Sequence, residues 1–399
     1  MFQILLIIIY LAFISLGLPD SLLGSAWPSM YGELNVAVSF AGIISMIIAG
    51  GTIISSLFSD RLIRRFGTGV VTVLSVAMTA VALMGFSVSH SFWQLCLWGI
   101  PYGLGAGSVD AALNNFVALH YKSRHMSWLH CFWGVGATAG PYIMGLCLTG
   151  GLRWNSGYRA IGMIQFVLVA CLLLSLPLWK AGKDEGKVEN LEYKEIGLRQ
   201  TLGLPGAKAI LTAFFCYCSL EATTGLWAGS FMVLHKGIDV ETAAKWASLF
   251  YLGITIGRFI CGFITDRFGD RFMVRLGQLL AAAGACLILL PVGNAAVLAG
   301  LILTGVGCAP IYPSLLHATP YNFGAEYSQS VMGMQMACAY VGTTLMPPLF
   351  GLLAEWIGVW FYPLYLLAFV AGMFVMTERM NRIRSASENQ GGIPSADMV

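Results

Sequence analysis

The sequence predicts an all-α integral membrane protein in which twelve transmembrane helices form two parallel six-helix repeats. Three observations carry this prediction: little charge, a series of long apolar segments, and residues that recur between the two halves of the chain. Only 10% of the 399 residues are charged, whereas 57% are hydrophobic. A soluble chain of this length needs more charge on its surface to stay dispersed. The apolar segments are long enough to cross a hydrocarbon core about 30 Å thick.

The first apolar segment, residues 3–29, is interpreted as a spanning helix and not as a signal peptide. It lacks a basic start and a small-residue cleavage site, and it is too long. Further apolar segments follow, separated by charged residues or by Gly and Pro. The twelve predicted spans are 3–29, 39–59, 69–88, 92–119, 128–150, 157–179, 207–235, 241–265, 271–292, 295–321, 328–354 and 359–378.

One long hydrophilic segment, 180–206, divides the spans six and six. We therefore expect an N-terminal half over 1–179, a linker over 180–206, a C-terminal half over 207–380 and a tail over 381–399. With the N-terminus inside, 17 Lys and Arg residues fall on the inner side and four on the outer side. Basic residues concentrate on the cytoplasmic side of membrane proteins. This predicts that both termini and the linker are cytoplasmic, in a plasma or inner membrane.

The two halves of the chain repeat at an offset of 206 residues. Asp60-Arg61 then falls on Asp266-Arg267, and four residues of the fifth span fall on identical residues of the eleventh. These four pairs are Gly136 with Gly342, Thr138 with Thr344, Pro141 with Pro347 and Gly145 with Gly351. Repeats in the same orientation predict a substrate cavity between the halves, near the membrane midplane.

The repeated acid–arginine pairs resemble a motif of the major facilitator superfamily. That family carries G-x-x-x-D-R-x-G-x-R between the second and third helices of each half, and the second copy here matches it from Gly262 onward. The first copy departs from it, because Ser56 stands where the pattern has Gly. The resemblance covers the chain up to about residue 381. It implies a conformational latch between neighbouring helices, built from Asp60, Arg61, Arg65, Asp266, Arg267 and Arg271.

The chain also resembles the fucose–proton symporter family, which includes glucose and galactose permeases. The fourth span reads Asp110-Ala111-Ala112-Leu113-Asn114-Asn115-Phe116, similar to that family's acid-(T/A)-A-x-N-x-Y stretch. Here Asn115 replaces the common Pro of the family. The first span carries Asp20, and the family also has an acid there. The resemblance implies that the acid of the fourth span takes part in proton coupling.

Acids inside the spans are candidates for coupling. Asp20, Asp110 and Glu221 lie away from the predicted helix ends, where an ionised carboxylate costs several kcal/mol unless it faces water or a partner. We expect Asp20 and Asp110 to bind the driving cation, a proton by preference; alternatively they are polar struts. For Glu221 two roles are expected: it either contacts substrate hydroxyls or holds its helix to a neighbouring helix. Arg258 snorkels to the surface or pairs with an acid.

Helical spacing places the acid of the fourth span on a face of small and polar residues. Gly103, Gly107, Asp110 and Asn114 follow an i, i+4, i+7, i+11 pattern. Small residues at this spacing allow two helices to approach closely. The pattern predicts a helix contact with a polar pair at one end.

Sugar sites combine amides or carboxylates with aromatic rings. This chemistry selects the substrate-binding candidates, each of which has helix packing as its alternative role. They are Trp27, Asn114, Asn115, Trp133, Gln165, Glu221, Trp227, Tyr312, His317 and Gln335. His317 is expected to lie deep in its span, whereas His120 and His130 are expected near the cytoplasmic surface.

No motif in the sequence indicates an enzyme. We find no metal-ligand spacing, phosphate loop or nucleophile motif, and we expect no cofactor, no metal and no nucleic-acid partner. The leading hypothesis is uptake of a monosaccharide or similar small polar solute, coupled to a proton or sodium, by a monomer in the lipid bilayer. Efflux of drugs or metabolites by proton antiport is the alternative, and a non-transporting receptor is a third class.

Overall fold

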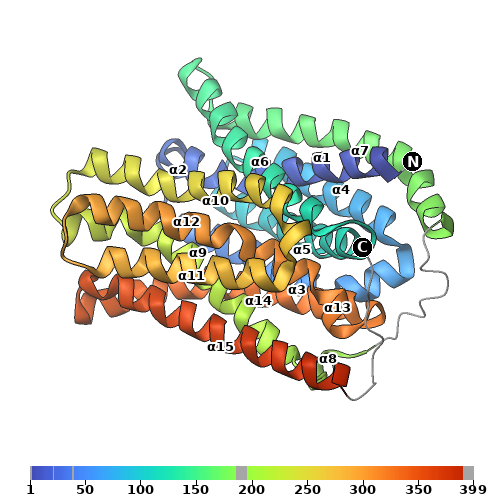
Figure 1. The fold of residues 1–399 in the computed structure, drawn as a ribbon. Helices are drawn as coiled ribbons and strands as arrows, with labels where there is room; N and C mark the ends of the chain where they lie inside the picture. The colour runs from blue at the N-terminus through green and yellow to red at the C-terminus, as the bar shows by residue number, and fades with distance from the viewer. Residues whose placement is uncertain (1, 21, 38–39, 186–195, 390–399) are drawn as a thin grey trace. The chain divides into compact units, whose positions relative to one another are not determined.

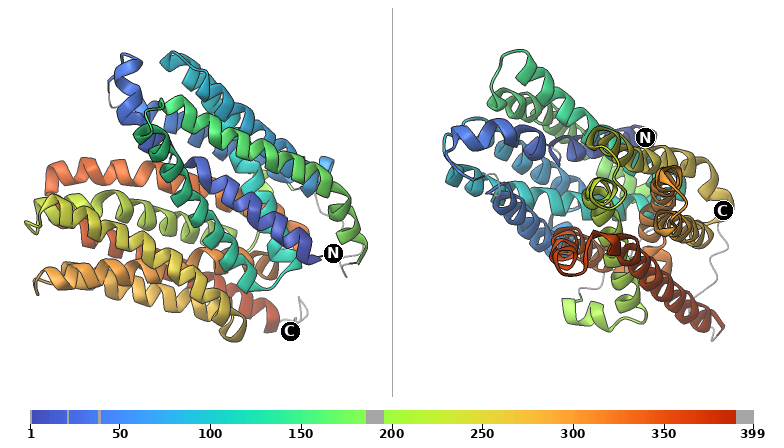
Figure 2. Two further views of the ribbon diagram at one scale, coloured as in Figure 1. Left: turned by 90° about the horizontal axis from the view of Figure 1, so that it is seen from above. Right: turned by 90° about the vertical axis from the view of Figure 1, so that its left-hand side faces the viewer.

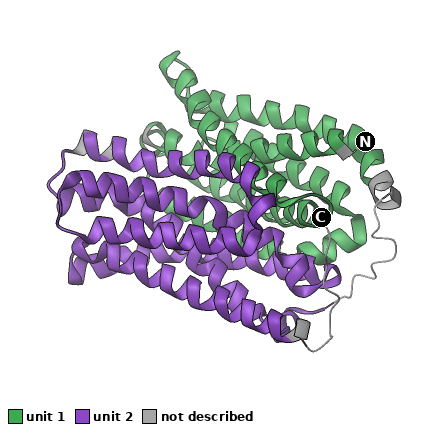
Figure 3. Ribbon diagram, viewed as in Figure 1, with its two compact units in different colours: residues 1–195 green, residues 196–399 purple. Residues whose placement is uncertain are grey.

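The computed structural model describes residues 2–20, 22–37, 40–185 and 196–389, and every regular element in these ranges is helical. The chain divides into two compact units, Met1–Glu195 and Ile196–Val399, which we call unit 1 and unit 2 (Figure 3). The predicted all-α membrane fold is confirmed.

Unit 1 consists of seven described helices (Figure 1). They are α1 (Phe2–Asp20), α2 (Leu22–Glu33), α3 (Ala41–Phe66), α4 (Thr68–Ser87), α5 (Phe92–His120), α6 (Ser123–Thr149) and α7 (Trp154–Glu185).

Unit 2 begins with a short helix and continues with longer ones. Its described elements are α8 (Leu198–Gly203), α9 (Ala207–Leu234), α10 (Val240–Phe268), α11 (Asp270–Leu289), α12 (Asn294–His317), α13 (Thr319–Phe323), α14 (Ala325–Ile357), the 3₁₀ turn η2 (Val359–Phe361) and α15 (Tyr362–Asn389).

Eleven spans in the described part of the chain are long and apolar enough to cross a membrane. The first of these, Gln3–Trp27, runs through α1 into α2. The remaining long helix, α5, has 29 residues and is not among these eleven spans. Each of the twelve predicted spans coincides with a long helix or, for the first, with α1 and α2. The helices differ from the prediction mainly at their polar ends.

Several helices extend beyond their predicted spans, and two of them enter the predicted linker and tail. α7 continues to Glu185, into the predicted linker, and α15 continues to Asn389, into the predicted tail. Lys, Glu and Arg are good helix formers, so a helix does not have to end where its apolar segment ends. The rest of the predicted linker contains α8, and residues 186–195 and 390–399 lie outside the described ranges.

The same packing scheme occurs in each unit. In unit 1, α1 packs on α6, α3 on α5, and α4 on α5 and α7. In unit 2, α9 packs on α14, α10 on α12, and α11 on α12 and α15; α15 packs more extensively on α9 than on α11. Figure 2 lets the reader follow these neighbouring helices from two further sides. The repeat read from the sequence is therefore also a repeat of helix contacts.

Glycines at equivalent positions allow these close contacts. A Cβ atom on Gly136 of α6 would lie 2.0 Å from the carbonyl oxygen of Ile14 of α1, and one on Gly342 of α14 would lie 2.8 Å from that of Phe215 of α9. Gly103 meets the α3 backbone in the same way. Such contacts replace the hydrophobic driving force that is absent between helices in lipid.

The acid–arginine pairs lie within the C-terminal parts of α3 and α10. The predicted spans, which ended at residues 59 and 265, had placed both pairs outside the helices. α3 ends at Phe66 and α4 begins at Thr68, so Gly67 is the one residue between them. Gly67 has φ 80° and ψ 157°, and Gly269 between α10 and α11 has φ 78° and ψ 157°. Only glycine adopts this conformation readily. The same backbone turn therefore joins α3 to α4 and α10 to α11, but Gly269 lies within its motif copy whereas Gly67 follows Arg65, the last residue of the first copy.

The outer helix faces are apolar. Leu174 of α7 is 82% exposed and Trp356 of α14 is 89% exposed. Exposed side chains of this kind on long apolar helices are typical of contact with lipid.

Candidate functional site

Asp20 lies at the end of α1, inside the first span, and its carboxylate is held by two other helices of unit 1. The Tyr102 hydroxyl of α5 donates to Oδ1 at 3.2 Å, and the Trp133 indole of α6 donates to Oδ2 at 2.8 Å. Tyr102 is buried, whereas Asp20 is exposed. In the described part of the chain, both hydrogen bonds to this carboxylate come from neutral donors. They stabilise an ionised carboxylate without fixing its charge as a salt bridge would.

Asp110 lies in the middle of α5 and is 6% exposed. The Asn114 amide, one helical turn later, donates from Nδ2 to Asp110 Oδ1 at 2.8 Å. The Oδ1 atom of Asn114 contacts Nε2 of His130 of α6 at 3.1 Å. The predicted polar pair of Asp110 and Asn114 is thus part of a buried chain of three side chains.

Sequence reasoning misplaced His130. We expected it near the surface because it opens the fifth predicted span, but it is 5% exposed, and its ring lies edge-on against Phe13 of α1 at 5.4 Å. The available signal was its spacing of three residues from Trp133, which places both side chains on one face of a helix. That face meets α1 and α5.

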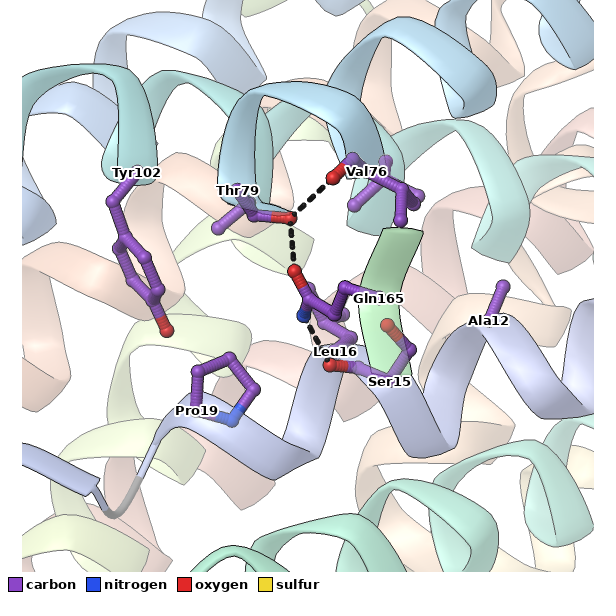
Figure 4. A pocket seen from close by; sticks show the side chains of 10 residues that line it. Ala12, Ser15, Leu16, Pro19, Val76, Thr79, Tyr102 and Gln165 are labelled. Carbon is purple, nitrogen blue, oxygen red and sulfur yellow. Dashed lines mark hydrogen bonds between the residues drawn. The ribbon is translucent and has the colours of Figure 1, made fainter. Parts of the chain in front are cut away.

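Gln165 is buried in a polar contact between three helices of unit 1 (Figure 4). Its amide donates to the carbonyl oxygen of Ser15 of α1 at 2.8 Å, and it accepts from Thr79 of α4 at 2.9 Å. The adjoining pocket has a volume of about 10 Å³, which accommodates about one water molecule. This pocket is too small for a sugar, and its geometry is that of a packing contact.

Two further candidates of unit 1 are buried. Trp27 is 5% exposed within an apolar cluster that includes Leu22 and Met30, which is the geometry of a core residue. Asn115 is 4% exposed, and its Oδ1 has no hydrogen-bond partner among the described residues.

In unit 2, a buried arginine faces an acid. Arg258 of α10 is 4% exposed and lies with Nη2 at 3.7 Å from Oε2 of Glu221 of α9. The same nitrogen donates to the Tyr217 hydroxyl of α9 at 3.3 Å. The Nε atom of Arg258 is buried and has no partner in the described ranges. Of the two roles left open by the sequence, Arg258 takes that of pairing with an acid.

An aromatic group lies beside this pair. Tyr312 of α12 packs against Phe214 at 4.8 Å and Tyr217 at 5.7 Å, and its hydroxyl donates to the sulfur of Met336 at 3.4 Å. Trp227, by contrast, donates its indole N–H to the carbonyl oxygen of Pro347 at 2.8 Å. This bond joins α9 to the proline-containing part of α14, as expected of a helix contact.

Of the remaining candidates of unit 2, His317 lies at a helix end and Gln335 lies inside a helix. His317 ends α12 and pairs through Nδ1 with Oδ2 of Asp270, the first residue of α11, at 2.6 Å. The expectation that His317 lies deep in its span is therefore wrong: the chain turns over at this position. Gln335 of α14 is fully buried, accepts from Thr319 at 2.9 Å, and has no partner for its Nε2 among the described residues.

Several of the latch candidates make contacts within their own helix. Asp60 forms an ion pair with Arg64, four residues later on α3, a partner that the proposed latch did not include. The guanidinium groups of Arg65 and Arg267 lie over the adjacent rings of Phe66 and Phe268 at 5.3 and 5.8 Å. Asp266 and Arg61 also have contacts, so neither is unpaired.

Outside the spans, Glu33 ties the end of α2 to the start of α7. Its Oε2 accepts from Arg153 at 2.7 Å and from the Trp154 indole at 2.9 Å. The Arg153 hydrogen bond is the main reason that the pKa of Glu33 lies below its usual value.

Two units with one packing scheme, apolar outer faces and polar side chains inside the spans define a multi-pass membrane protein of the transporter class. The sequence matches the model of the Major Facilitator Superfamily over residues 9–243 and 209–390. The chain therefore belongs to the Major Facilitator Superfamily, whose members are membrane transporters that bind small-molecule substrates.

Several relatives are similar to this chain over most of its length. "Bypass of stop codon protein 6" of Saccharomyces cerevisiae is 22% identical over 88% of this chain and 77% of its own length. The "Cis,cis-muconate transport protein" of Acinetobacter baylyi is 23% identical over 87% of this chain and 86% of its own. The "Glucose/mannose transporter GlcP" of Bacillus subtilis is 22% identical over 86% of each chain.

Among solved structures, the transporter FucP in its outward conformation aligns with a TM-score of 0.74. The alignment covers 94% of this chain and 98% of FucP at 15% identity. At this level of identity the likeness establishes the fold.

Proposed function

We propose that this transporter takes up a small polar solute, with a monosaccharide as the first candidate, by alternating access driven by a cation, a proton by preference. The observation that carries the proposal is Asp20, an acid inside the first span whose carboxylate accepts from the neutral donors Tyr102 and Trp133. A carboxyl group in such a place takes up and releases a proton without breaking a salt bridge.

Asp110 is the second acid of the proposed coupling. It is more buried than Asp20, and Asn114 holds one of its oxygens. We assign Asp20 the exchange of the proton and Asp110 a contribution to the coupling between proton and solute. Coupling of this kind requires that each ligand favour the binding of the other.

A monosaccharide is supported by two similarities. GlcP is named as a glucose/mannose transporter, and the fold is that of FucP, named as a fucose:proton symporter. In unit 2, Tyr312 and Glu221 supply hydrogen-bonding groups of the type that binds sugar hydroxyls. These two residues are the proposed solute contacts of that unit.

A second candidate substrate is an organic acid. It is favoured by Arg258, which is buried, lies 3.7 Å from Glu221 and keeps its Nε without a partner in the described part of the chain. A distance of 3.7 Å exceeds that of a charge-assisted hydrogen bond, so the guanidinium retains donors for a carboxylate. The relative from Acinetobacter baylyi is named as a muconate transporter.

We further propose that both termini face the cytoplasm and that the protein resides in the plasma or inner membrane. The positively charged ends of the helices, including Arg64 and Arg65 of α3 and Arg267 of α10, support this orientation. A reporter that is active only in the cytoplasm, fused after residue 399, tests it. Activity is expected, and its absence would reverse the orientation.

The main experiment is transport into liposomes under an inward proton gradient without sodium. Labelled D-glucose, D-mannose, L-fucose and cis,cis-muconate are compared for wild type, Asp20→Asn and Asp110→Asn. Asp239→Asn is the matched control, because Asp239 caps α10 through the Thr242 amide at 2.9 Å and Asn caps a helix equally well.

We expect gradient-driven accumulation of one solute, lost in Asp20→Asn and kept in Asp239→Asn. If muconate is the one solute that accumulates, the substrate class is organic acids and not monosaccharides. Uphill accumulation by Asp20→Asn refutes the coupling role of that residue. If a sodium gradient alone drives uptake, the cation is sodium, and if neither gradient does, proton-antiport efflux becomes the leading function.

A further inference from the structure

The contacts between Asp110, Asn114 and His130 have a fixed direction. Asn114 offers the carboxyl group of Asp110 its amide N–H, at 2.8 Å from Oδ1. The same amide nitrogen also donates to the Asp110 backbone carbonyl at 3.0 Å. The Asn114 Oδ1 atom is then directed to Nε2 of His130 at 3.1 Å, and because an amide oxygen only accepts, Nε2 must carry the hydrogen.

We infer that His130 is a positioning residue for proton coupling. Its Nε2–H holds the Asn114 amide in the orientation that presents N–H, and not C=O, to the Asp110 carboxylate. The inference rests on the proposed function, in which Asp110 takes part in coupling. His130 acts through Asn114 and does not itself contact the solute.

The surroundings of His130 hold the ring in place for this role. His130 is 5% exposed, and Phe13 packs against it edge-on at an interplanar angle of 87°. A ring packed in this way has little rotational freedom, so its hydrogen bond defines the amide orientation.

One face of α6 positions both Asp20 and Asp110, the two acids of the proposed coupling. Trp133 lies three residues after His130 on α6 and donates directly to Asp20 at 2.8 Å. His130 reaches Asp110 through one intervening amide. A movement of α6 relative to α1 and α5 would therefore alter the hydrogen bonding of Asp20 and Asp110 together.

The test compares two polar substitutions in reconstituted protein. In His130→Gln, the side-chain amide nitrogen occupies the place of Nε2 and still donates to Asn114. In His130→Asn, the amide nitrogen falls short, at the place of Nδ1. His120→Asn is the control, because within the described part of the chain the His120 ring bonds to the Phe116 carbonyl of its own helix and to no residue of the hydrogen-bond chain.

Uptake driven by the proton gradient is measured with labelled D-glucose and cis,cis-muconate, alongside counterflow without a gradient. We expect His130→Asn to lower gradient-driven accumulation by about tenfold, the effect of losing one hydrogen bond to a charged network, and to leave counterflow within about twofold. His130→Gln and His120→Asn should behave as wild type. Equal accumulation in His130→Asn and His130→Gln overturns the inference.

A second measurement does not depend on transport. In ¹⁵N-histidine NMR of the purified protein, the His130 signal is assigned by its absence in His130→Gln. We expect the Nε2–H tautomer, and a change of its shift in Asp110→Asn. An Nδ1–H tautomer overturns the inference whatever the solute. If the tautomer is as expected but Asp110→Asn still accumulates solute uphill, the proposed role of Asp110 fails and the hydrogen-bond chain is structural.

Discussion

Arg258 of α10 and Glu221 of α9 form a buried ion pair whose closest atoms are 3.7 Å apart. Arg258 is 4% exposed, so its charge is compensated inside unit 2 by Glu221 and by the dipole of the Tyr217 hydroxyl. A buried charge that loses its partner is costly, whereas removal of both charges is much less so.

Glu221→Gln should therefore destabilise the protein, and the double variant Glu221→Gln/Arg258→Gln should be more stable than Glu221→Gln alone. The single variant is expected to lose about 3 kcal/mol, the low end for a broken buried pair, because the Glu221 side chain is 21% exposed. Thermal unfolding in detergent, arranged as a double-mutant cycle, measures the coupling. Additive effects would mean that the two charges do not interact.

Gly136→Ala should destabilise unit 1, because the new Cβ would lie 2.0 Å from the carbonyl oxygen of Ile14. Overpacking of this kind costs about 1–3 kcal/mol. Gly145 of the same helix has no atom within 4 Å of the equivalent position, so Gly145→Ala is the matched control. It should be neutral or stabilising by up to about 1 kcal/mol, since Ala favours a helix over Gly. Similar melting temperatures for the two variants would contradict the packing of α6 on α1.

Gln165→Leu should cost about 2 kcal/mol, because it removes the side-chain donor to the Ser15 carbonyl; the Thr79 hydroxyl loses one acceptor but keeps the Val76 carbonyl. Ser15→Ala at the same pocket should stay within about 0.5 kcal/mol of wild type, since the Ser15 hydroxyl has no partner among the described residues. The melting temperatures of the two variants in one detergent test this contrast. A larger loss for Ser15→Ala would mean that the pocket holds a partner for its hydroxyl.

The contact of Glu33 with Arg153 and Trp154 should weaken in acid. The pKa of Glu33 is lowered from its ordinary value of 4.5, chiefly by the Arg153 hydrogen bond. The contribution of this contact to stability is present above that ordinary value and is lost as the pH falls through the lowered pKa. Because Glu33 and Arg153 are well exposed, the effect on stability is small.

The Trp154 indole, which donates to Glu33 at 2.9 Å, provides an optical signal for the same event. The difference in fluorescence between wild type and Trp154→Phe should change below the ordinary pH of carboxyl titration. Glu33→Gln removes the titrating group and should abolish this change. If the change persists in Glu33→Gln, another group is responsible.

The helices were predictable because the signal for a span is local: about twenty apolar residues between charged ones define it. The repeat was predictable because Gly136 and Gly342 meet their neighbours in the same way. Asp110 and Asn114 were recognised as a pair by their spacing of one helical turn. Each of these features is contained in a single helix or in a comparison of two.

The contacts between site residues of different helices were not predictable in the same way. His130 was misplaced because its burial depends on α1 and α5 and not on its own span. His317 was expected to be deep because the apolar segment runs on past the helix end. The sequence around Trp227 does not show whether its ring contacts a substrate or packs between helices. In the structure its indole N–H donates to the carbonyl oxygen of Pro347. Which face of a helix meets which neighbour is decided by packing between helices.

The single glycine between α3 and α4 has a mechanical consequence. Gly67 closes the first helix and opens the second, and Gly269 does the same between α10 and α11. A connection of one residue keeps the end of α3 next to the start of α4, and the end of α10 next to the start of α11. A displacement of one helix end at either glycine therefore displaces the neighbouring helix end as well.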